Sequence, residues 1–321
     1  MRFASFTPHR ALRLIAALAL ALIPALTASN AFAITIRDAA GRDVTVNDTS
    51  RIVSVGGAVT EILYALGLAD RIVAVDTTSL YPARALKEKP NVGYMRALSA
   101  EGVLGLNPSL VLAIEGAGPK ETVAVLEQAS VPLVRVPDHY TAEGIVEKMR
   151  LIADIVGVHD RGEYLACVVK ADLAELEKLR AKITQPKKVL FVLSFLNGKP
   201  MVAGRNTAAD GIIKLAGGIN AMDAYDGYKQ ISDEAVIAAG PDTVLSMQRP
   251  QDNLDATTVF SNAAFSTTPA AAAKSFVAMD GLYLLGFGPR TAAAARDLAS
   301  SLYPAFGHDI LPSERKTSGC Y

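Results

Sequence analysis

One tyrosine, Tyr81, stands in the stretch "DTTSLYPARA" between a hydroxyl-rich segment and a proline. The stretch follows the apolar run "RIVAV", so we expect Tyr81 in a loop beyond the carboxyl end of a buried strand. A phenol with an unperturbed pKa of ~10 is a poor base at neutral pH. A ferric ion changes this, because a hard cation stabilises the phenolate oxygen, and tyrosinate is one of the axial ligands of haem iron. Tyr81 is therefore either a ligand of ferric iron or an ordinary exposed tyrosine of a turn.

An arginine, Arg249, takes the corresponding place later in the chain. It follows the apolar run "DTVLSM", at what we expect to be the carboxyl end of another strand. A guanidinium in this position would stabilise a phenolate that faces it.

The elements that must position these side chains show an internal duplication. The segment "LSAEGVLGLNPSLVLAI" from Leu98 and the segment "ISDEAVIAAGPDTVLSM" from Ile231 align at an offset of 133 residues, with six of seventeen positions identical. Their common pattern predicts a capped short helix, a turn marked by proline and a buried strand. Ser99 and Ser232 are the expected N-caps, and Glu101 and Glu234 stand in the first turns, where the helix dipole favours an acid.

The order of the neighbouring elements repeats as well. In the first half "RIVSV" precedes the helical pattern "AVTEILYALG", and in the second half "KVLFVL" leads through a loop to "TAADGIIKLAGG". Between the halves, Glu163 to Ile183 contains neither Gly nor Pro and has apolar residues at helical spacing. We therefore predict an α/β fold of two lobes with mostly parallel sheets, joined by one long linker helix, with the ligand cleft between the lobes. The expected boundaries are a signal peptide at 1–33, lobes at 34–160 and 186–310, the linker helix at 161–185 and a C-terminal tail at 311–321.

The first 33 residues have the composition of a secretory signal peptide. Three arginines and no acid accompany an apolar run that is too short to span a bilayer, and "AFA" ends the segment at Ala33. The remaining chain has 29 basic and 32 acidic residues, a formal charge of −3, so nucleic acid is not an expected partner. No later segment approaches membrane length. Whether Cys167 and Cys320 form a disulfide is left open by the sequence.

Other chemistry is poorly supported by the residues after Ala33. The three histidines, His139, His159 and His308, lack ligand-like spacing, which disfavours a metal-ion carrier, and we expect them at the surface or at helix ends. The glycine patterns "GAGPKE" and "GFGPRT" lack the last glycine of a dinucleotide fingerprint, and there is no nucleophile elbow. We do not expect an enzyme.

The chain from about Ile34 to Phe306 resembles the periplasmic haem-binding proteins of bacterial haem-uptake ABC transporters. The similar stretches span both halves: "DTTSLYPARA", "VGYMRALSAEGVLGLNPSLVLA", "AGRNTAADGIIKLAGG", "GYKQISDEAVIAAGPD" and "VAMDGLYLLGFGPR". This resemblance implies that Tyr81 is the axial ligand of ferric haem, with Arg249 or Arg84 as the arginine that supports the phenolate. It also implies that Glu101 and Glu234 dock onto arginines of the inner-membrane permease, which works with an ATPase.

Haem also needs apolar walls and donors for two propionates. Small residues stand just before two expected helix starts, where backbone N–H groups are suited to binding carboxylates. The candidates for these contacts are Gly56, Gly57, Arg205, Asn206 and Thr207, with Tyr228 as a further lining residue.

The resemblance thus predicts a monomeric periplasmic protein that delivers haem to an ABC importer. A corrinoid or ferric-siderophore carrier of the same architecture is the alternative. The chain contains no Trp for a large aromatic corrinoid pocket, and Tyr81 has no evident role in such a protein.

Overall fold

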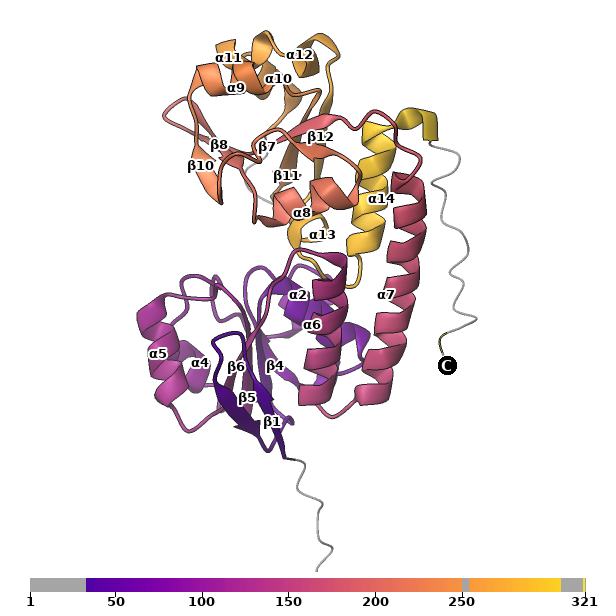
Figure 1. Ribbon diagram of the computed structural model, residues 1–321. Helices are drawn as coiled ribbons and strands as arrows, with labels where there is room; N and C mark the ends of the chain where they lie inside the picture. The colour runs from indigo at the N-terminus through magenta and orange to yellow at the C-terminus, as the bar shows by residue number, and fades with distance from the viewer. Residues whose placement is uncertain (1–32, 250–253, 307–319, 321) are drawn as a thin grey trace, which may run out of the picture. The chain divides into compact units, whose positions relative to one another are not determined.

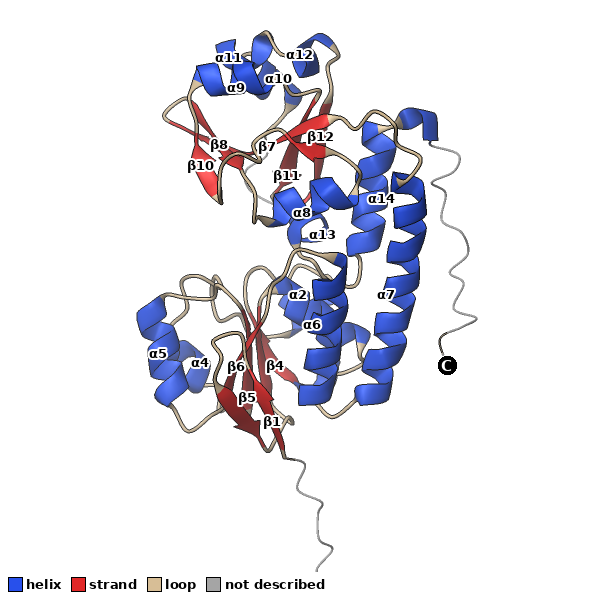
Figure 2. Ribbon diagram, viewed as in Figure 1, coloured by secondary structure: helices blue, strands red, loops and turns tan. Residues whose placement is uncertain are grey.

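The computed structural model describes residues 33–249, 254–306 and 320, and Figure 1 shows the order of their elements. The expected signal peptide, apart from Ala33, lies outside the described residues, as does the expected C-terminal tail apart from Cys320. Ala33–Tyr321 form one compact unit. The two lobes of the predicted α/β fold are present, each with its own sheet (Figure 2).

The N-terminal sheet has the strand order β4-β3-β5-β6, and every neighbouring pair is parallel. Its apolar runs give strands that are buried on both faces, as parallel sheets require. A short antiparallel pair, β1 and β2, precedes it. The bounds are β1 (Ile34–Arg37), β2 (Asp43–Val46), β3 (Ile52–Val55), β4 (Ile72–Val75), β5 (Leu110–Ile114) and β6 (Leu133–Val136).

Helices cover both faces of this sheet, and the alternation of side chains along β5 shows how. Leu110, Leu112 and Ile114 belong to one apolar cluster with residues of α2 and α6, whereas Val111 and Ala113 belong to another with residues of α4 and α5. The helices of this lobe are α2 (Gly57–Ala65), η1 (Ala69–Arg71), α3 (Arg84–Glu88), α4 (Ala100–Leu104), α5 (Lys120–Gln128) and α6 (Ala142–Ile155).

The C-terminal sheet is mixed. Its strand order is β10-β8-β7-β11-β12, and β9 also pairs with β7. The pairs β7–β11, β11–β12 and β7–β9 are parallel. Strand β8 pairs antiparallel with β7 and with β10. The bounds are β7 (Lys188–Leu196), β8 (Lys199–Ala203), β9 (Ile219–Asn220), β10 (Tyr228–Gln230), β11 (Thr243–Gln248) and β12 (Phe276–Asp280).

The connection after "KVLFVL" differs from the expected loop, because it is a β-hairpin. Asn197 and Gly198 have φ angles of 52° and 77°, and Leu196 pairs with Lys199. An Asn-Gly pair readily adopts these positive φ values, which match the twist of a two-residue hairpin. The Asn-Gly dipeptide was the local signal for this hairpin.

Helices and turns complete the C-terminal lobe. Those that follow β8 are α8 (Ala208–Leu215), α9 (Asp233–Ala239), α10 (Ala256–Phe260), α11 (Ala263–Ser266), α12 (Pro269–Ala272), α13 (Gly281–Leu285), α14 (Thr291–Leu302) and η2 (Pro304–Phe306).

The predicted duplication is confirmed in the element order. Helix α4 leads to β5 and helix α9 leads to β11, and each of these strands lies between two parallel neighbours. The Ser99 and Ser232 side chains accept hydrogen bonds from the backbone N–H groups of Gly102 and Ala235, so both serines are N-caps.

The predicted long helix between the lobes is α7 (His159–Arg180). It begins four residues before the segment without Gly that starts at Glu163, and it includes Gly162, which lies against α6. A β-carbon at Gly162 would approach the Ala153 β-carbon to 2.3 Å, so a side chain there would push the two helices apart. Helix α14 packs against both α7 and α8.

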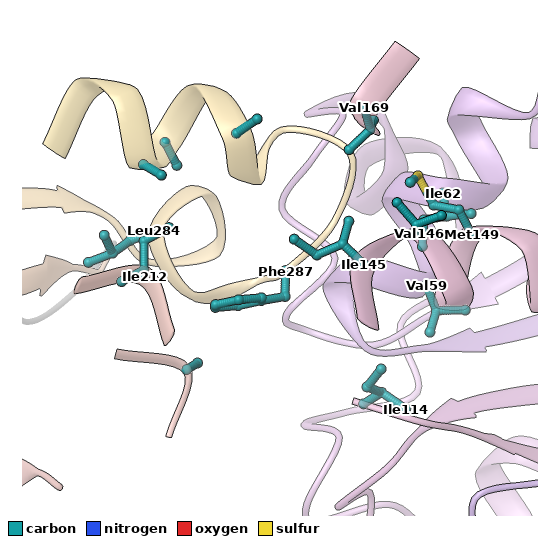
Figure 3. Packing of buried hydrophobic residues seen from close by; sticks show 14 of the residues in the cluster. Val59, Ile62, Ile114, Ile145, Val146, Met149, Val169, Ile212, Leu284 and Phe287 are labelled. Carbon is teal, nitrogen blue, oxygen red and sulfur yellow. The ribbon is translucent and has the colours of Figure 1, made fainter. Parts of the chain in front are cut away.

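One apolar cluster contains residues of both lobes. Figure 3 shows Phe287 between Leu284 and Ile212 on one side and Ile145 on the other. Phe287 is fully buried and has a φ of 50°. The loop 286–290, which joins α13 to α14, therefore inserts a large side chain into the core.

Cys167 in α7 and Cys320 form a disulfide across a sequence separation of 153 residues. A crosslink that closes so long a loop stabilises the fold by lowering the conformational entropy of the unfolded chain. We expect replacement of both cysteines by serine to lower the free energy of unfolding by ~2–5 kcal/mol. Urea unfolding of the oxidised protein, the reduced protein and the double variant measures this, and the last two should coincide. An unchanged midpoint in both would contradict the expectation.

Candidate functional site

Tyr81 lies beyond the carboxyl end of β4, where the sequence places it. Its side chain is 45% exposed, and the peptide bond to Pro82 is cis. Strand β4 pairs in parallel with β3, so the loop after β4 and the start of α2 lie at the same edge of the sheet. The phenol is thus presented at the edge where ligands of parallel α/β sheets bind.

The hydroxyl-rich segment before Tyr81 is fastened by Asp76, whose side chain is fully buried. Its carboxylate accepts hydrogen bonds from the Gly56 N–H at 2.9 Å, the Thr78 N–H at 3.0 Å, the Thr78 hydroxyl at 2.7 Å and the Ser79 hydroxyl at 2.9 Å. Four donors compensate the desolvation of this carboxylate. Asp76 therefore fixes the backbone of the loop that carries Tyr81.

A chain of hydroxyl groups extends this anchor into the core. The Ser79 and Thr60 hydroxyls are 2.7 Å apart, and Thr60 is also 2.7 Å from the Ser54 hydroxyl. All three residues are buried. Ser54 lies in β3 and Thr60 in α2, so the loop is tied to both elements. The sequence analysis missed this network, although Asp and Ser/Thr directly after a strand are the usual residues of such side-chain turns.

The predicted propionate donors Gly56 and Gly57 have partners within the protein. The Gly56 N–H donates to Asp76, and the Gly57 N–H donates to the Thr78 hydroxyl at 3.0 Å. Gly56 has a φ of 107°, and a β-carbon there would approach Ile114 to 2.6 Å. The two glycines thus allow the close approach of β5 and the Tyr81 loop to the start of α2.

Arg290 is the arginine that the structure places on Tyr81. Its guanidinium carbon lies 3.7 Å from the centroid of the Tyr81 ring and 5.1 Å from that of Tyr283. The guanidinium donates to both carboxylate oxygens of Glu61, at 3.1 and 2.9 Å, and the Arg290 backbone N–H donates to Glu61 at 3.2 Å. Glu61 lies in α2 and is separated from Arg290 by 229 residues. Neither residue was predicted, because no local pattern connects positions so far apart.

The two arginines considered from the sequence have other contacts. The Arg84 guanidinium carbon lies 5.1 Å from the centroid of the Tyr64 ring. Arg249 directly follows β11, and its positive charge acts on the phenol of Tyr228. Burial raises the pKa of Tyr228, and Arg96 and Arg249 oppose that rise. Support of Tyr81 by either Arg249 or Arg84 stays a prediction.

The predicted contacts before α8 divide into a buried cap and an exposed pair. Thr207 is 3% exposed; its hydroxyl accepts from the Asp210 N–H at 3.1 Å and donates to the Gly204 carbonyl at 2.9 Å, so it caps the helix. The Asn206 amide donates to Asp226 at 2.7 Å, and the Arg205 Nε lies 3.8 Å from the same carboxylate. Arg205 and Asn206 remain accessible, whereas Thr207 has a structural role.

Tyr228 begins β10 and is 41% exposed. Its ring makes an edge contact with the buried ring of Phe191, with centroids 6.4 Å apart. Tyr140 is its electrostatic neighbour in the other lobe, and burial, followed by the charge of Asp138, raises the pKa of Tyr140. The two phenols therefore stay protonated at neutral pH and can donate hydrogen bonds.

A buried ion pair lies beside Tyr140. The Lys148 side chain is fully buried, and its ammonium group contacts Asp138, whose side chain is 18% exposed. The same ammonium donates to the Phe287 carbonyl at 3.3 Å, and the Phe287 ring packs on Tyr140 with centroids 5.2 Å apart. The loop 286–290 is thus held by Lys148 at Phe287 and by Glu61 at Arg290.

Glu101 and Glu234 are exposed and occupy equivalent first turns of α4 and α9. A hydrogen bond from the Ser232 side chain is the main cause that lowers the pKa of Glu234. The glutamate therefore carries its negative charge at neutral pH, as docking onto arginines would require.

The described residues contain no group of three or more His, Cys, Asp or Glu side chains able to hold a bare metal ion. His139 is exposed and His159 begins α7, where the Asp154 carboxylate raises its pKa; both positions are as predicted. His308 lies outside the described residues.

Two α/β lobes with mostly parallel sheets, a long connecting helix and an exposed phenol at a sheet edge are typical of two-lobed substrate-binding proteins. A profile of the family described as "Periplasmic binding protein" matches residues 52–282. The chain belongs to the periplasmic binding protein family.

Known proteins narrow the comparison further. One similar structure is that of the periplasmic heme-binding protein RhuT from Roseiflexus sp. RS-1, in apo form. Its sequence is 42% identical to this one, the match covers 80% of this chain and 99% of RhuT, and the TM-score is 0.75. The uncharacterized ABC transporter substrate-binding lipoprotein YvrC of Bacillus subtilis (strain 168) is 28% identical over 85% of this chain and 86% of its own. The vitamin B12-binding protein of Vibrio campbellii (strain ATCC BAA-1116) is 29% identical over 63% of this chain and 72% of its own. The resemblance to haem-binding proteins of ABC uptake systems is confirmed.

Proposed function

We propose that this chain is the haem-binding component of a bacterial ABC importer, with Tyr81 as the protein ligand of ferric haem iron. The observation that carries the proposal is the 45% exposed phenol of Tyr81, presented at the sheet edge on a loop fastened by the buried Asp76. The similarity to RhuT supports haem as the ligand, and the similarity to YvrC supports the role in an ABC transporter.

Each part of the site has a defined task in this function. The Asp76 network holds the loop, so little conformational entropy is lost when Tyr81 meets the iron. The positive charge of Arg290, 3.7 Å from the ring centroid, favours a phenol that takes up negative charge on binding iron. The accessible side chains of Arg205, Asn206 and Tyr228 are the candidates for the propionates. No covalent chemistry on the ligand is required.

We place the working protein in the periplasm, as a monomer that meets a permease and its ATPase. The expected signal peptide and the family support export. Among the described residues, no helix combines the length and the apolar character needed to cross a membrane.

A corrinoid is the second candidate ligand, because relatives such as the Vibrio campbellii protein are named for vitamin B12. We favour haem over a corrinoid because the phenol of Tyr81, in contact with the Arg290 guanidinium, can bind ferric iron as a phenolate. The decisive experiment is an optical titration of the purified residues 34–321 with hemin, with cobalamin and with a ferric siderophore. With hemin we expect a ferric-phenolate spectrum that saturates, and the saturation point gives the number of haems bound. We expect no response to cobalamin or to the siderophore at equal concentration. Saturation by cobalamin alone would replace haem by a corrinoid.

Replacing both Glu101 and Glu234 by alanine should reduce haem uptake in cells several-fold and leave hemin affinity unchanged. The two exposed carboxylates would contribute to the orientation and rate of docking more than to ligand binding. The matched control replaces Glu121 and Glu143, which stand in the first turns of α5 and α6. A loss of hemin affinity in the Glu101/Glu234 variant would refute the docking role.

A further inference from the structure

We infer that Arg290 is a positioning residue for Tyr81: it holds the phenol ring by its face and is itself held by the Glu61 carboxylate. This inference rests on the proposed function, in which Tyr81 binds the iron. The guanidinium carbon lies 3.7 Å from the Tyr81 ring centroid, well within the range of a cation–π contact.

The guanidinium is fixed before any ligand arrives. Glu61 is 5% exposed, and its two carboxylate oxygens accept hydrogen bonds from Nε and Nη2 of Arg290. This bidentate pair fixes the plane of the guanidinium as well as its position. A third hydrogen bond runs from the Arg290 backbone N–H to the same carboxylate, at 3.2 Å. A β-carbon added at Gly288 would lie 3.5 Å from this carboxylate, so the loop passes close to Glu61.

The backbone that carries Arg290 is anchored as well. Phe287, three residues earlier, is fully buried, and its carbonyl accepts from the buried Lys148 at 3.3 Å. On the other side of Arg290 begins α14, for which Arg290 is the N-cap residue. The Tyr283 ring, 5.1 Å from the guanidinium carbon, is fixed by a hydrogen bond from its hydroxyl to Asp297 at 2.8 Å.

These contacts give the Tyr81 side chain a definite orientation although it is 45% exposed. The Asp76 network fixes the backbone of the loop, but none of its hydrogen bonds reaches the phenol. Arg290 supplies the missing constraint on the ring, and it does so from the segment between α13 and α14, in the other lobe. The orientation of the iron ligand thus depends on the attachment of loop 286–290 to Glu61.

The first test needs no haem. The protein is labelled with 3-fluorotyrosine, and its ¹⁹F NMR resonances for Tyr81 and Tyr283 are assigned with the Y81F and Y283F variants. Arg290→Met and Glu61→Gln should both shift the Tyr81 resonance and narrow it toward that of a mobile ring, and Arg290→Lys should have a smaller effect. The matched control is Arg150→Met, which breaks the exposed bidentate pair of Arg150 with Glu163. A Tyr81 resonance that is the same in all folded variants overturns the inference.

The second test uses hemin. Arg290→Met should weaken binding roughly 5- to 30-fold, the equivalent of a partly desolvated cation–π contact, and should move the ferric charge-transfer band. Arg290→Lys should recover part of both effects because it keeps the charge. Should Arg290→Met not fold, Glu61→Gln and Arg290→Lys carry the same comparison. An affinity and band equal to those of the wild type in the folded variants refute the positioning role.

The two tests separate this inference from the function on which it rests. If wild-type protein shows no spectrum with hemin, the proposed function fails, whatever the ¹⁹F resonances do. If wild type binds hemin through Tyr81 and the Arg290 variants match it in both measurements, only the inference fails.

Discussion

Replacing Tyr81 by phenylalanine is expected to abolish the ferric-phenolate charge-transfer band of the hemin complex and to weaken hemin binding by more than ~100-fold. The loss should be large because partners that merely support a metal ligand already contribute 10- to 100-fold in affinity. The variant removes one oxygen atom from a half-exposed side chain. Its folding should therefore be unchanged.

The control for this variant is Tyr164→Phe. Tyr164 lies in α7 and is 51% exposed, so it matches Tyr81 in exposure and lies outside the site. Optical titration and the spectrum at saturation are the measurements. If the Tyr81→Phe complex kept the band and affinity of the wild type, another side chain would be the iron ligand.

Replacing Asp138 by alanine should lower the free energy of unfolding by ~3–5 kcal/mol, because the buried ammonium of Lys148 would lose its counter-ion. Only the Phe287 carbonyl would remain as its described partner. Lys148→Met should have a smaller effect, since the remaining carboxylate is 18% exposed and can be solvated. The double variant should be more stable than Asp138→Ala alone, because it leaves no buried charge.

Urea unfolding followed by circular dichroism measures this order. The control is Glu163→Ala, which breaks the exposed pair with Arg150 and should change stability little. Equal stabilities for Asp138→Ala and Glu163→Ala would mean that the Lys148 ammonium finds another partner or reaches water. Because Lys148 also holds loop 286–290, hemin affinity should fall in Asp138→Ala and Lys148→Met as well, but not in the Glu163→Ala control.

Much of the architecture could be predicted from short windows of sequence. The runs that become β3, β4, β5 and β11 are apolar enough to identify buried strands, and the serines at positions 99 and 232 identify two helix starts. The place of Tyr81 after β4 follows from the order of the elements alone. These features depend on neighbours within a few residues, whose hydrogen bonds and side-chain periodicity are local.

The site required more than this. The role of Asp76 depends on four donors that come from its own turn and from the start of α2. The N–H groups of Gly56 and Gly57 look available in the sequence, yet the folded loop occupies them. A local sequence pattern can identify hydrogen-bond donors, but it cannot show which acceptor binds them in the folded protein.

By itself, then, the sequence determined the two-lobed α/β plan, its internal duplication and the position of the phenol beyond a strand. Only the tertiary structure decided that Arg290 rather than Arg84 lies on the Tyr81 ring, that Glu61 holds Arg290, and that Cys167 pairs with Cys320. The disulfide joins residues 153 positions apart, and the ion pair joins residues 229 positions apart. Such partners are selected by the packing of whole elements, because several arginines carry the same charge and only topology brings one of them within reach.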